Sequence, residues 1–310
     1  MKNILVKKHN DLINSRYSLS EIEIKIVSIL ISMIQKDDID FHDYVINIDE
    51  LQELTNVKSV KNNAYYIQIS KDLMKKTLVI ENGDSTQIFN WVSFAEHTKN
   101  TSILTFNIHK KLRSYLIDLR ENYLSYDIRN ILNLKSSYVI RLYELLIKEF
   151  NEYKHYNKNA HFCEIVLNIE HLKNIFEIPF SQTYHDIKRH ILLKAQEQFQ
   201  QKTNIIFSFD EIKENKKVVS LKIKIYENNS NLDYLKDLNT FISYMRKNYI
   251  NKDVYNAQNM IISISEKGFL YNKKNLKEYQ KKDAKLAWQT LYKLAQENKL
   301  LCLKQQQFNF

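Results

Sequence analysis

The chain has 310 residues, of which 44% are hydrophobic and 26% charged, an ordinary composition for a globular protein with about two domains. Its net charge is +10, since residues 1–130 are neutral, residues 131–230 carry +3 and residues 231–310 carry +7. With two glycines and one proline, it lacks the glycine-rich loops of nucleotide-binding enzymes. The basic surplus suggests a polyanionic partner, although lysines that only keep a protein soluble would give the same charge.

We expect neither a secretion signal nor a membrane-spanning segment. The first ten residues contain lysines but no apolar core, and the longest apolar run, residues 26–34, is too short to cross a bilayer. Cys163 and Cys302 are far apart, as expected of free thiols in a reducing compartment. We expect a cytoplasmic protein with no cofactor and no membrane contact.

Residues 1–130 are predicted to form a first domain. Ser18 or Ser20 is suited to cap a helix whose apolar residues recur at helical spacing. The elements predicted after it are a strand over residues 44–48, a short helix from residue 49, a helix over 62–76, strands over 77–81 and 86–94 joined by Asn82-Gly83, and a strand over 102–108. Apolar residues of the 62–76 helix predict its buried face, and these are Ala64, Tyr65, Ile69, Leu73 and Met74. Residues 109–134 are predicted to be a connecting helix.

Residues 131–228 are predicted to repeat this plan as a second domain. Ser136 or Ser137 is suited to cap its first helix, and Thr183 to cap its longest helix, with Asp186 three residues on. The other predicted elements are a strand over residues 162–168, a short helix over 170–176, the long helix over 184–201, and strands over 205–209 and 218–226. Residues 210–217 are expected to form a charged ribbon tip.

One motif occurs in both domains. The segment Ile46-Asn47-Ile48-Asp49-Glu50-Leu51 recurs, with identical spacing, as Leu167-Asn168-Ile169-Glu170-His171-Leu172. Each copy follows an apolar helix and precedes a long helix and a β-ribbon, which is the element order of a winged helix. The sequence therefore predicts an α+β fold with two tandem winged-helix domains.

Residues 229–310 are expected to form a basic, mainly helical C-terminal extension. Helices are predicted over residues 235–249 and 276–300, while residues 254–265 fit neither helix nor strand clearly. The charge of the extension would suit further contacts with DNA or an acidic partner, and the sequence does not separate these.

Residues with catalytic or metal-binding chemistry are few. A nickase of the rolling-circle type needs two closely spaced histidines on one strand, and no such pair occurs. The nearest cluster, His155, His161 and Cys163, lacks an evident fourth ligand, so we expect no metal and no catalytic residue.

DNA binding is better supported. If Ile187, Ile191 and Ala195 face the core, His185 and Arg189 point outward at the start of the helix that would enter the major groove. Arginine can read guanine and glutamine can read adenine, while lysines of the ribbon suit phosphates. The side chains predicted to contact DNA are Gln182, Thr183, His185, Lys188, Arg189, Lys213, Lys216 and Lys217 in the second domain, and Asn62, Asn63, Lys71 and Lys75 in the first.

The chain also resembles a known family, the iteron-binding plasmid replication initiators (theta-type Rep proteins). The resemblance covers about residues 8–226. The matching segments are Leu134-Lys135-Ser136-Ser137-Tyr138, Arg141-Leu142-Tyr143-Glu144-Leu145-Leu146, Tyr184 with Ile187-Lys188-Arg189, Thr203-Asn204-Ile205, and, nearer the N-terminus, Asn10 with Leu12-Ile13-Asn14 and Asn63-Ala64-Tyr65-Tyr66.

The resemblance implies two winged-helix domains related by pseudo-symmetry. Such initiators bind direct repeats at a plasmid origin as monomers, help to melt an A+T-rich region, and recruit the host replication initiator and the replicative helicase. As homodimers in equilibrium with monomers, they bind an inverted repeat and repress their own gene. The family's recognition helix lies in the second domain, here at Gln182, His185, Lys188 and Arg189, while its first domain reads the other end of the repeat and contributes to the dimer interface.

Two other functions are alternatives to the replication initiator. A transcriptional repressor with tandem winged helices would show the same pattern, and only the DNA it binds would distinguish it from an initiator. An enzyme such as a nickase or primase would instead have to cut DNA or make primers.

Overall fold

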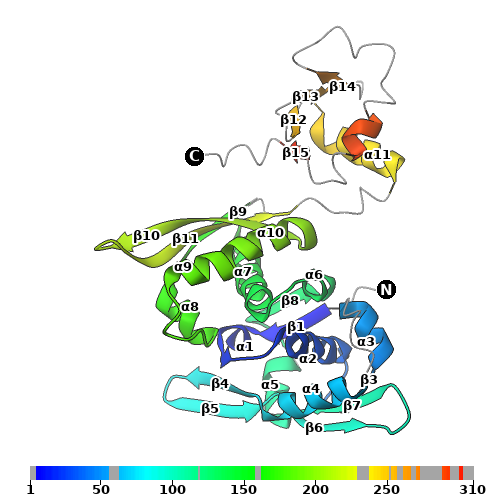
Figure 1. The fold of residues 1–310 in the computed structure, drawn as a ribbon, viewed down its shortest axis with the longest axis vertical. Coiled ribbons are helices and arrows are strands. Elements are labelled where there is room, and N and C mark those ends of the chain that lie inside the picture. Colours follow the sequence, from blue (N-terminus) through cyan, green and yellow to red (C-terminus); the bar gives the residue numbers. More distant parts are fainter. Residues whose placement is uncertain are drawn as a thin grey trace. The chain divides into compact units, whose positions relative to one another are not determined.

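The computed structural model describes residues 5–55, 63–117, 119–157, 162–228, 237–250, 253–256, 261–266, 270–272, 288–293 and 300–302. The chain divides into two compact units, residues 1–229 and residues 230–310. Each unit has its own hydrophobic core. Both winged helices lie in the larger unit (Figure 1).

The larger unit begins with a segment that precedes the first winged helix. Strand β1 (Leu5–His9), helix α1 (Asn10–Asn14) and strand β2 (Arg16–Tyr17) lead into helix α2 (Glu21–Met33). Ser20 caps α2 through a capping box with Glu23, which satisfies backbone N–H groups at the helix start. One of the two predicted caps is thus confirmed. In the apolar stripe of α2, Ile26, Ile29 and Leu30 are buried as expected, while Ile22 and Met33 are half-buried.

The first winged helix follows the predicted element order. After α2 come strand β3 (Asp43–Asn47), helix α3 (Ile48–Thr55) and helix α4 (Asn63–Lys75). Strands β6 (Val92–His97) and β7 (Ile103–Ile108) complete a sheet of order β3-β7-β6. A further hairpin, β4 (Thr77–Asn82) and β5 (Ser85–Asn90), belongs to a different sheet, in which β4 pairs with β2. The hairpin turns at Gly83, whose φ of +53° suits glycine.

The second winged helix repeats this arrangement. Helix α7 (Ser137–Tyr156), strand β9 (Phe162–Asn168) and helix α8 (Ile169–Ile175) precede one long helix, which consists of α9 (Tyr184–Ile187), a π-helical turn (Lys188–Leu192) and α10 (Leu193–Lys202). Strands β10 (Ile205–Glu214) and β11 (Lys217–Glu227) form a ribbon in a sheet of order β10-β11-β9. β9 pairs with β11 as β3 pairs with β7, which confirms the repeat expected from the shared motif.

One continuous core joins the two winged helices. Helix α7 packs against α1 and α2, and a single cluster of buried side chains extends from Val6 to Ile225. Arg141 of α7 is buried within it and donates hydrogen bonds to the backbone oxygens of Tyr17 (2.7 Å), Ser15 (2.7 Å) and Ile175 (2.5 Å). Lys8 pairs with Glu144 at 2.6 Å, also fully buried. These polar contacts tie the N-terminal segment to the second winged helix.

The prediction that residues 109–134 form a connecting helix is wrong. The segment instead contains a 3₁₀ turn at Lys110–Leu112, helix α5 (Arg113–Leu116), strand β8 (Tyr123–Asp127) and helix α6 (Arg129–Leu132). β8 pairs antiparallel with β1, and β1 itself was not predicted. This pairing joins segments more than a hundred residues apart, which local periodicity does not reveal.

Four further expectations are corrected by the structure. The predicted strand over residues 86–94 is two strands in different sheets, separated at Trp91. In α4 the buried tyrosine is Tyr66, while Ala64 and Tyr65 are exposed. Ser136 precedes α7 but makes no side-chain capping hydrogen bond. The expected ribbon tip over residues 210–217 is mostly strand, because β10 continues to Glu214 and β11 starts at Lys217.

The C-terminal unit was expected to be mainly helical, and its described part also contains a sheet. Helix α11 (Leu238–Tyr249) packs its Phe241 and Met245 against Trp288 and Leu291. Strands β12 (Asp253–Asn256), β13 (Ile261–Ile264), β14 (Leu270–Asn272) and β15 (Leu300–Cys302) form an antiparallel sheet of order β14-β13-β12-β15. Of the helix predicted over residues 276–300, residues 288–293 are helical and Leu300 belongs to β15, while residues 276–287 and 294–299 lie outside the described residues. Within the described segments, no helix is both long and apolar enough to span a bilayer.

Candidate nucleic-acid interface

The long helix of residues 184–202, which we call the recognition helix, begins at a fixed cap. The Thr183 hydroxyl accepts a hydrogen bond from the backbone N–H of Asp186, whose carboxylate accepts one from the Thr183 N–H at 2.9 Å. Before the cap, Lys173 of α8 donates to the backbone oxygen of Gln182 at 2.5 Å. The predicted capping box is confirmed, and the first turn of the helix has a defined geometry.

The recognition helix has one buried face. Ile187, Ile191, Ala195 and Phe199 are buried, as the periodicity predicts. These residues are four apart, a spacing that over-rotates by about 40° per step in a regular α-helix. The wider π-helical turn at Lys188–Leu192 reduces this drift and keeps the stripe on the core. His185 and Arg189 are consequently exposed on the opposite face.

Lys188 lies on the flank of the recognition helix, where it meets the ribbon. Its ammonium group is 2.8 Å from Oε1 of Glu211 on β10. The Tyr184 hydroxyl donates to the same oxygen at 3.0 Å, and the ammonium group of Lys213 lies 3.2 Å from Oε2. The hydrogen bond from Lys188, together with those from Tyr184 and Lys213, lowers the pKa of Glu211 to about 2. Two of the predicted DNA contacts are therefore paired with a carboxylate.

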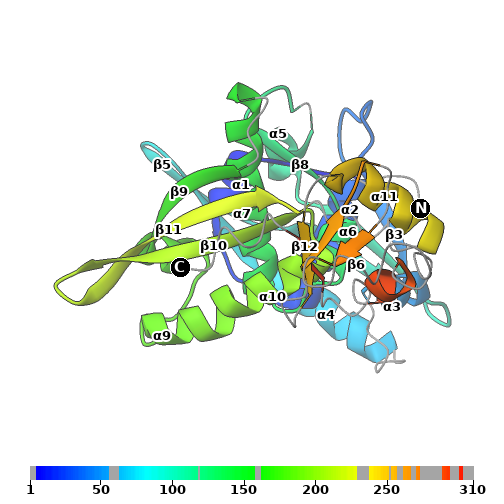
Figure 2. The same ribbon diagram turned by 90° about the horizontal axis from the view of Figure 1, so that it is seen from above.

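The ribbon ends in a two-residue turn with a lysine in it. Both loop residues have positive φ, 47° for Asn215 and 70° for Lys216, as a type I′ hairpin turn requires. Lys216 and Lys217 are exposed at this end, and both views show the ribbon projecting beyond the rest of its winged helix (Figures 1 and 2). A non-glycine residue at such a φ is strained, and strain of this kind occurs at functional sites.

The predicted residues of the first winged helix are in more varied settings. Asn63 donates to the backbone oxygen of Thr101 at 2.9 Å and so fixes the start of α4 against the β6–β7 hairpin. Lys71 and Lys75 are exposed one turn apart, and Lys75 pairs with Asp72 at 3.3 Å. Asn62 lies outside the described residues. Of the predicted residues in the first winged helix, Lys71 and Lys75 therefore lie on one solvent-exposed face of α4.

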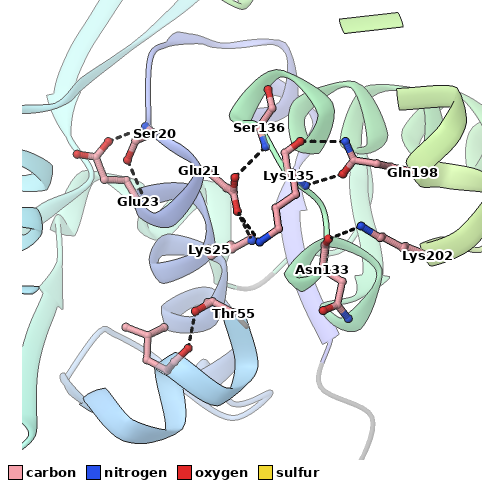
Figure 3. A network of polar contacts seen from close by, with 11 residues as sticks. Ser20, Glu21, Glu23, Lys25, Thr55, Asn133, Lys135, Ser136, Gln198 and Lys202 are labelled. Carbon is pink, nitrogen blue, oxygen red and sulfur yellow. Dashed lines mark hydrogen bonds and ion pairs between the residues drawn. The ribbon is translucent and has the colours of Figure 1, made fainter. Parts of the chain in front are cut away.

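A set of polar contacts fixes the linker between the winged helices (Figure 3). Glu21 of α2 accepts a hydrogen bond from the backbone N–H of Ser136 at 2.9 Å and pairs with the buried Lys25 at 2.7 Å. Gln198 of α10 exchanges hydrogen bonds with the backbone of Lys135, and Lys202 donates to the backbone oxygen of Asn133 at 3.1 Å. The far end of the recognition helix is thereby joined to α2 through residues 133–136.

Several of these positions were not predicted from the sequence. Glu211 and Lys173 did not appear among the candidates, because their partners are brought close only by the fold. Phe180, which was not among the predicted site residues, is 90% exposed three residues before the cap at Thr183. A large apolar side chain flanking a cap was a signal that could have marked this surface.

The other candidate chemistry has no structural support among the residues described. No three His, Cys, Asp or Glu residues of that part of the chain come together as metal ligands, and His161 lies outside it. Cys163 is buried, and burial raises the pKa of its thiol to about 11, so this thiol is a poor nucleophile at neutral pH.

Comparison with known proteins identifies both winged helices. The family described as Initiator Replication protein, WH1, matches residues 5–147, and that described as Initiator Rep protein, WH2, matches residues 168–225. A replication initiation protein of Escherichia coli is 25% identical over 197 residues, which are 61% of this chain and 58% of that protein. This chain thus spans less than two thirds of the length of that relative.

A solved structure shows the same fold. The crystal structure of the Pi initiator protein in complex with iteron DNA superimposes with a TM-score of 0.58 and 16% sequence identity. The superposition covers 74% of this chain and 100% of the Pi chain. Since the two family matches together include both winged helices and more than half of the sequence, this chain belongs to the family of replication initiator proteins with tandem winged-helix domains.

Proposed function

We propose that this protein is a plasmid replication initiator that binds direct repeats (iterons) in double-stranded DNA at the origin. The observation that carries the proposal is the exposed start of the recognition helix, with His185 and Arg189 outward, beside a ribbon that ends in Lys216 and Lys217. The helix would read bases in the major groove, and the ribbon lysines would contact phosphates. A protein of the same fold, the Pi initiator, is known in complex with iteron DNA.

The first winged helix would read the other end of each repeat. In support, α4 occupies the place in the first winged helix that the recognition helix has in the second, and its exposed Lys71 and Lys75 suit phosphates. The linker contacts and the shared core fix one winged helix relative to the other. We therefore propose that both contact one continuous site.

Further parts of the proposal rest on membership of the initiator family. The bound protein would promote melting of a nearby A+T-rich region and recruit the host replication initiator and the replicative helicase. A homodimer in equilibrium with the monomer would bind an inverted repeat and repress the protein's own gene. These events would take place in the cytoplasm, where the plasmid lies, and would require no catalysis by this chain.

The proposal is tested by fluorescence anisotropy on short duplexes from the DNA flanking the gene, across a salt series. Binding to a direct repeat should be at least about a thousandfold tighter than to a scrambled duplex, as for typical specific binders. Equal and steeply salt-dependent binding to every duplex would contradict it. Specific binding to an inverted repeat alone would favour a transcriptional repressor, and cleavage of supercoiled DNA with a divalent metal would favour a nickase.

A further inference from the structure

Glu211 is a residue of the ribbon strand β10, on the surface proposed to meet DNA, and its carboxylate contacts the recognition helix. Its carboxylate lies 2.8 Å from the ammonium group of Lys188 and accepts a hydrogen bond from the Tyr184 hydroxyl at 3.0 Å, both on the helix. The ammonium group of Lys213, on the ribbon, lies 3.2 Å from the same carboxylate. One acidic side chain therefore binds both DNA-reading elements of the second winged helix.

This position is unfavourable for simple binding to a polyanion. A carboxylate repels phosphates, and a lysine already paired with it must break that pair before it can contact a phosphate oxygen. The side chain of Glu211 is 21% exposed, so it is accessible to solvent and is not a fully buried structural charge. By pairing with Lys188 and Lys213, Glu211 leaves fewer lysine ammonium groups free to bind any duplex.

Glu211 also sets the geometry that base recognition needs. Base contacts require side chains held to a fraction of an ångström, whereas flexible lysines can reach phosphates from many positions. Tyr184 and Lys188 lie one turn apart on the helix, and both bind the same carboxylate on β10. The ribbon is thereby fixed against the first turn of the recognition helix, beside Arg189.

We infer that Glu211 is a specificity-determining residue of this site, an inference that rests on the proposed function. It keeps Lys188 and Lys213 from the phosphates of unrelated DNA and positions the helix for the bases of the cognate repeat. Specificity is the difference between the affinity for the cognate repeat and the affinity for unrelated DNA. Glu211 increases this difference by weakening the binding of unrelated DNA.

The test compares E211Q with E214Q, because Glu214 is an exposed residue of the same strand and its substitution changes the net charge equally. Affinities are measured by anisotropy for the repeat duplex and a scrambled duplex over a salt series. E211Q should bind the scrambled duplex roughly three- to tenfold more tightly than wild type, with a salt slope steeper by about one, because at least one lysine is released. Its affinity for the repeat should not rise in proportion, so the specificity ratio falls. E214Q should leave that ratio unchanged.

A second pair of variants gives an answer even if E211Q folds poorly, which thermal unfolding would reveal. Lys213 is paired with Glu211 while Lys216 is exposed at the turn, so K213Q should weaken binding to the scrambled duplex less than K216Q does. Equal changes in E211Q and E214Q, or equal losses in K213Q and K216Q, would overturn the inference. Wild-type protein that does not distinguish the two duplexes would instead overturn the proposed function.

Discussion

At the scale of single residues, the proposed DNA surface contains side chains of two kinds. Arg189 is exposed at the start of the recognition helix, where it can approach a base edge. Lys216 lies at the end of the ribbon, where a positive charge can follow the DNA backbone. The two positions therefore predict different consequences for the same change to alanine.

Arg189→Ala should weaken binding to the cognate repeat by about 1–3 kcal/mol, the usual effect of losing a bidentate base contact. Binding to a scrambled duplex should change much less. Lys216→Ala should weaken binding to both duplexes alike and reduce the salt slope by about one unit. Anisotropy titrations at several salt concentrations check both results, and an intact specificity ratio in Arg189→Ala would mean that another face of the helix reads the bases.

The ionisation of Glu211 predicts a pH effect on stability. Its pKa is about 2 in the folded protein, below the ordinary value of 4.5, so its pairing stabilises the fold above pH 4.5. That contribution is lost as the pH falls from 4.5 toward 2, because the folded state must then take up a proton. Urea unfolding at several pH values should show a steeper loss of stability in this window for wild type than for E211Q. Parallel curves would show that the ion pairs with Lys188 and Lys213 do not stabilise the fold.

At the scale of elements, the turn between β10 and β11 combines backbone strain with an exposed positive charge. Asn215 and Lys216 both adopt positive φ, a conformation in which glycine at the second loop position is favoured. A lysine at this place retains a positive charge at the end of the ribbon at some cost in stability.

Lys216→Gly should therefore stabilise the protein by about 1 kcal/mol, because glycine has no Cβ to clash at φ 70°. It should weaken DNA binding as much as Lys216→Ala, since both remove the same charge. Lys216→Ala is the matched control, as it retains the strained backbone and should leave stability nearly unchanged. Urea unfolding measures the difference, and equal stability of the two variants would exclude strain at this turn.

The elements that were predicted correctly are those set by local sequence. The caps at Ser20 and Thr183 and the strand β9 follow from residue types and spacing within a few positions. The segment after residue 109 was mistaken for a helix because β8 is a strand only through its pairing with β1. In α4, Tyr65 and Tyr66 are adjacent tyrosines, and only tertiary packing decides that Tyr66 is buried.

The candidate site was predictable to a similar extent. The outward direction of His185 and Arg189 follows from helical periodicity and agrees with the structure. The pairing of Lys188 with Glu211 joins residues 23 apart in sequence, on different elements, and no local pattern contains it. Whether the predicted side chains contact DNA stays a prediction.

At the scale of the whole molecule, the packing contact between the N-terminal segment and α7 depends on Arg141. Its guanidinium group lies 3.7 Å from the ring centroid of Tyr17 and 4.7 Å from that of Phe176. Burial lowers the pKa of this guanidinium, yet arginine stays charged in proteins, and the three backbone oxygens that it binds stabilise this charge.

Arg141→Ala should destabilise the larger unit by about 3–5 kcal/mol, because three buried carbonyl groups lose their donor and a cavity is left between two rings. Arg129→Ala is the matched control, since Arg129 is 58% exposed and its ion pair with Asp127 should be worth less than about 1 kcal/mol. Urea unfolding compares the two variants. Similar losses of unfolding free energy in both variants would mean that the packing of the N-terminal segment on α7 does not depend on the buried arginine.

The continuous core has a consequence for the length of DNA that the protein can bind. Since both winged helices share one set of buried side chains, neither can shift along DNA without opening that core. One base pair inserted between the two halves of a repeat would displace them by about 3.4 Å and rotate them by roughly 36°. We expect such a site to be bound by one winged helix alone, with the affinity of a half-site. Repeats bound in the proposed way should therefore tolerate sequence changes between their two halves but not changes of spacing.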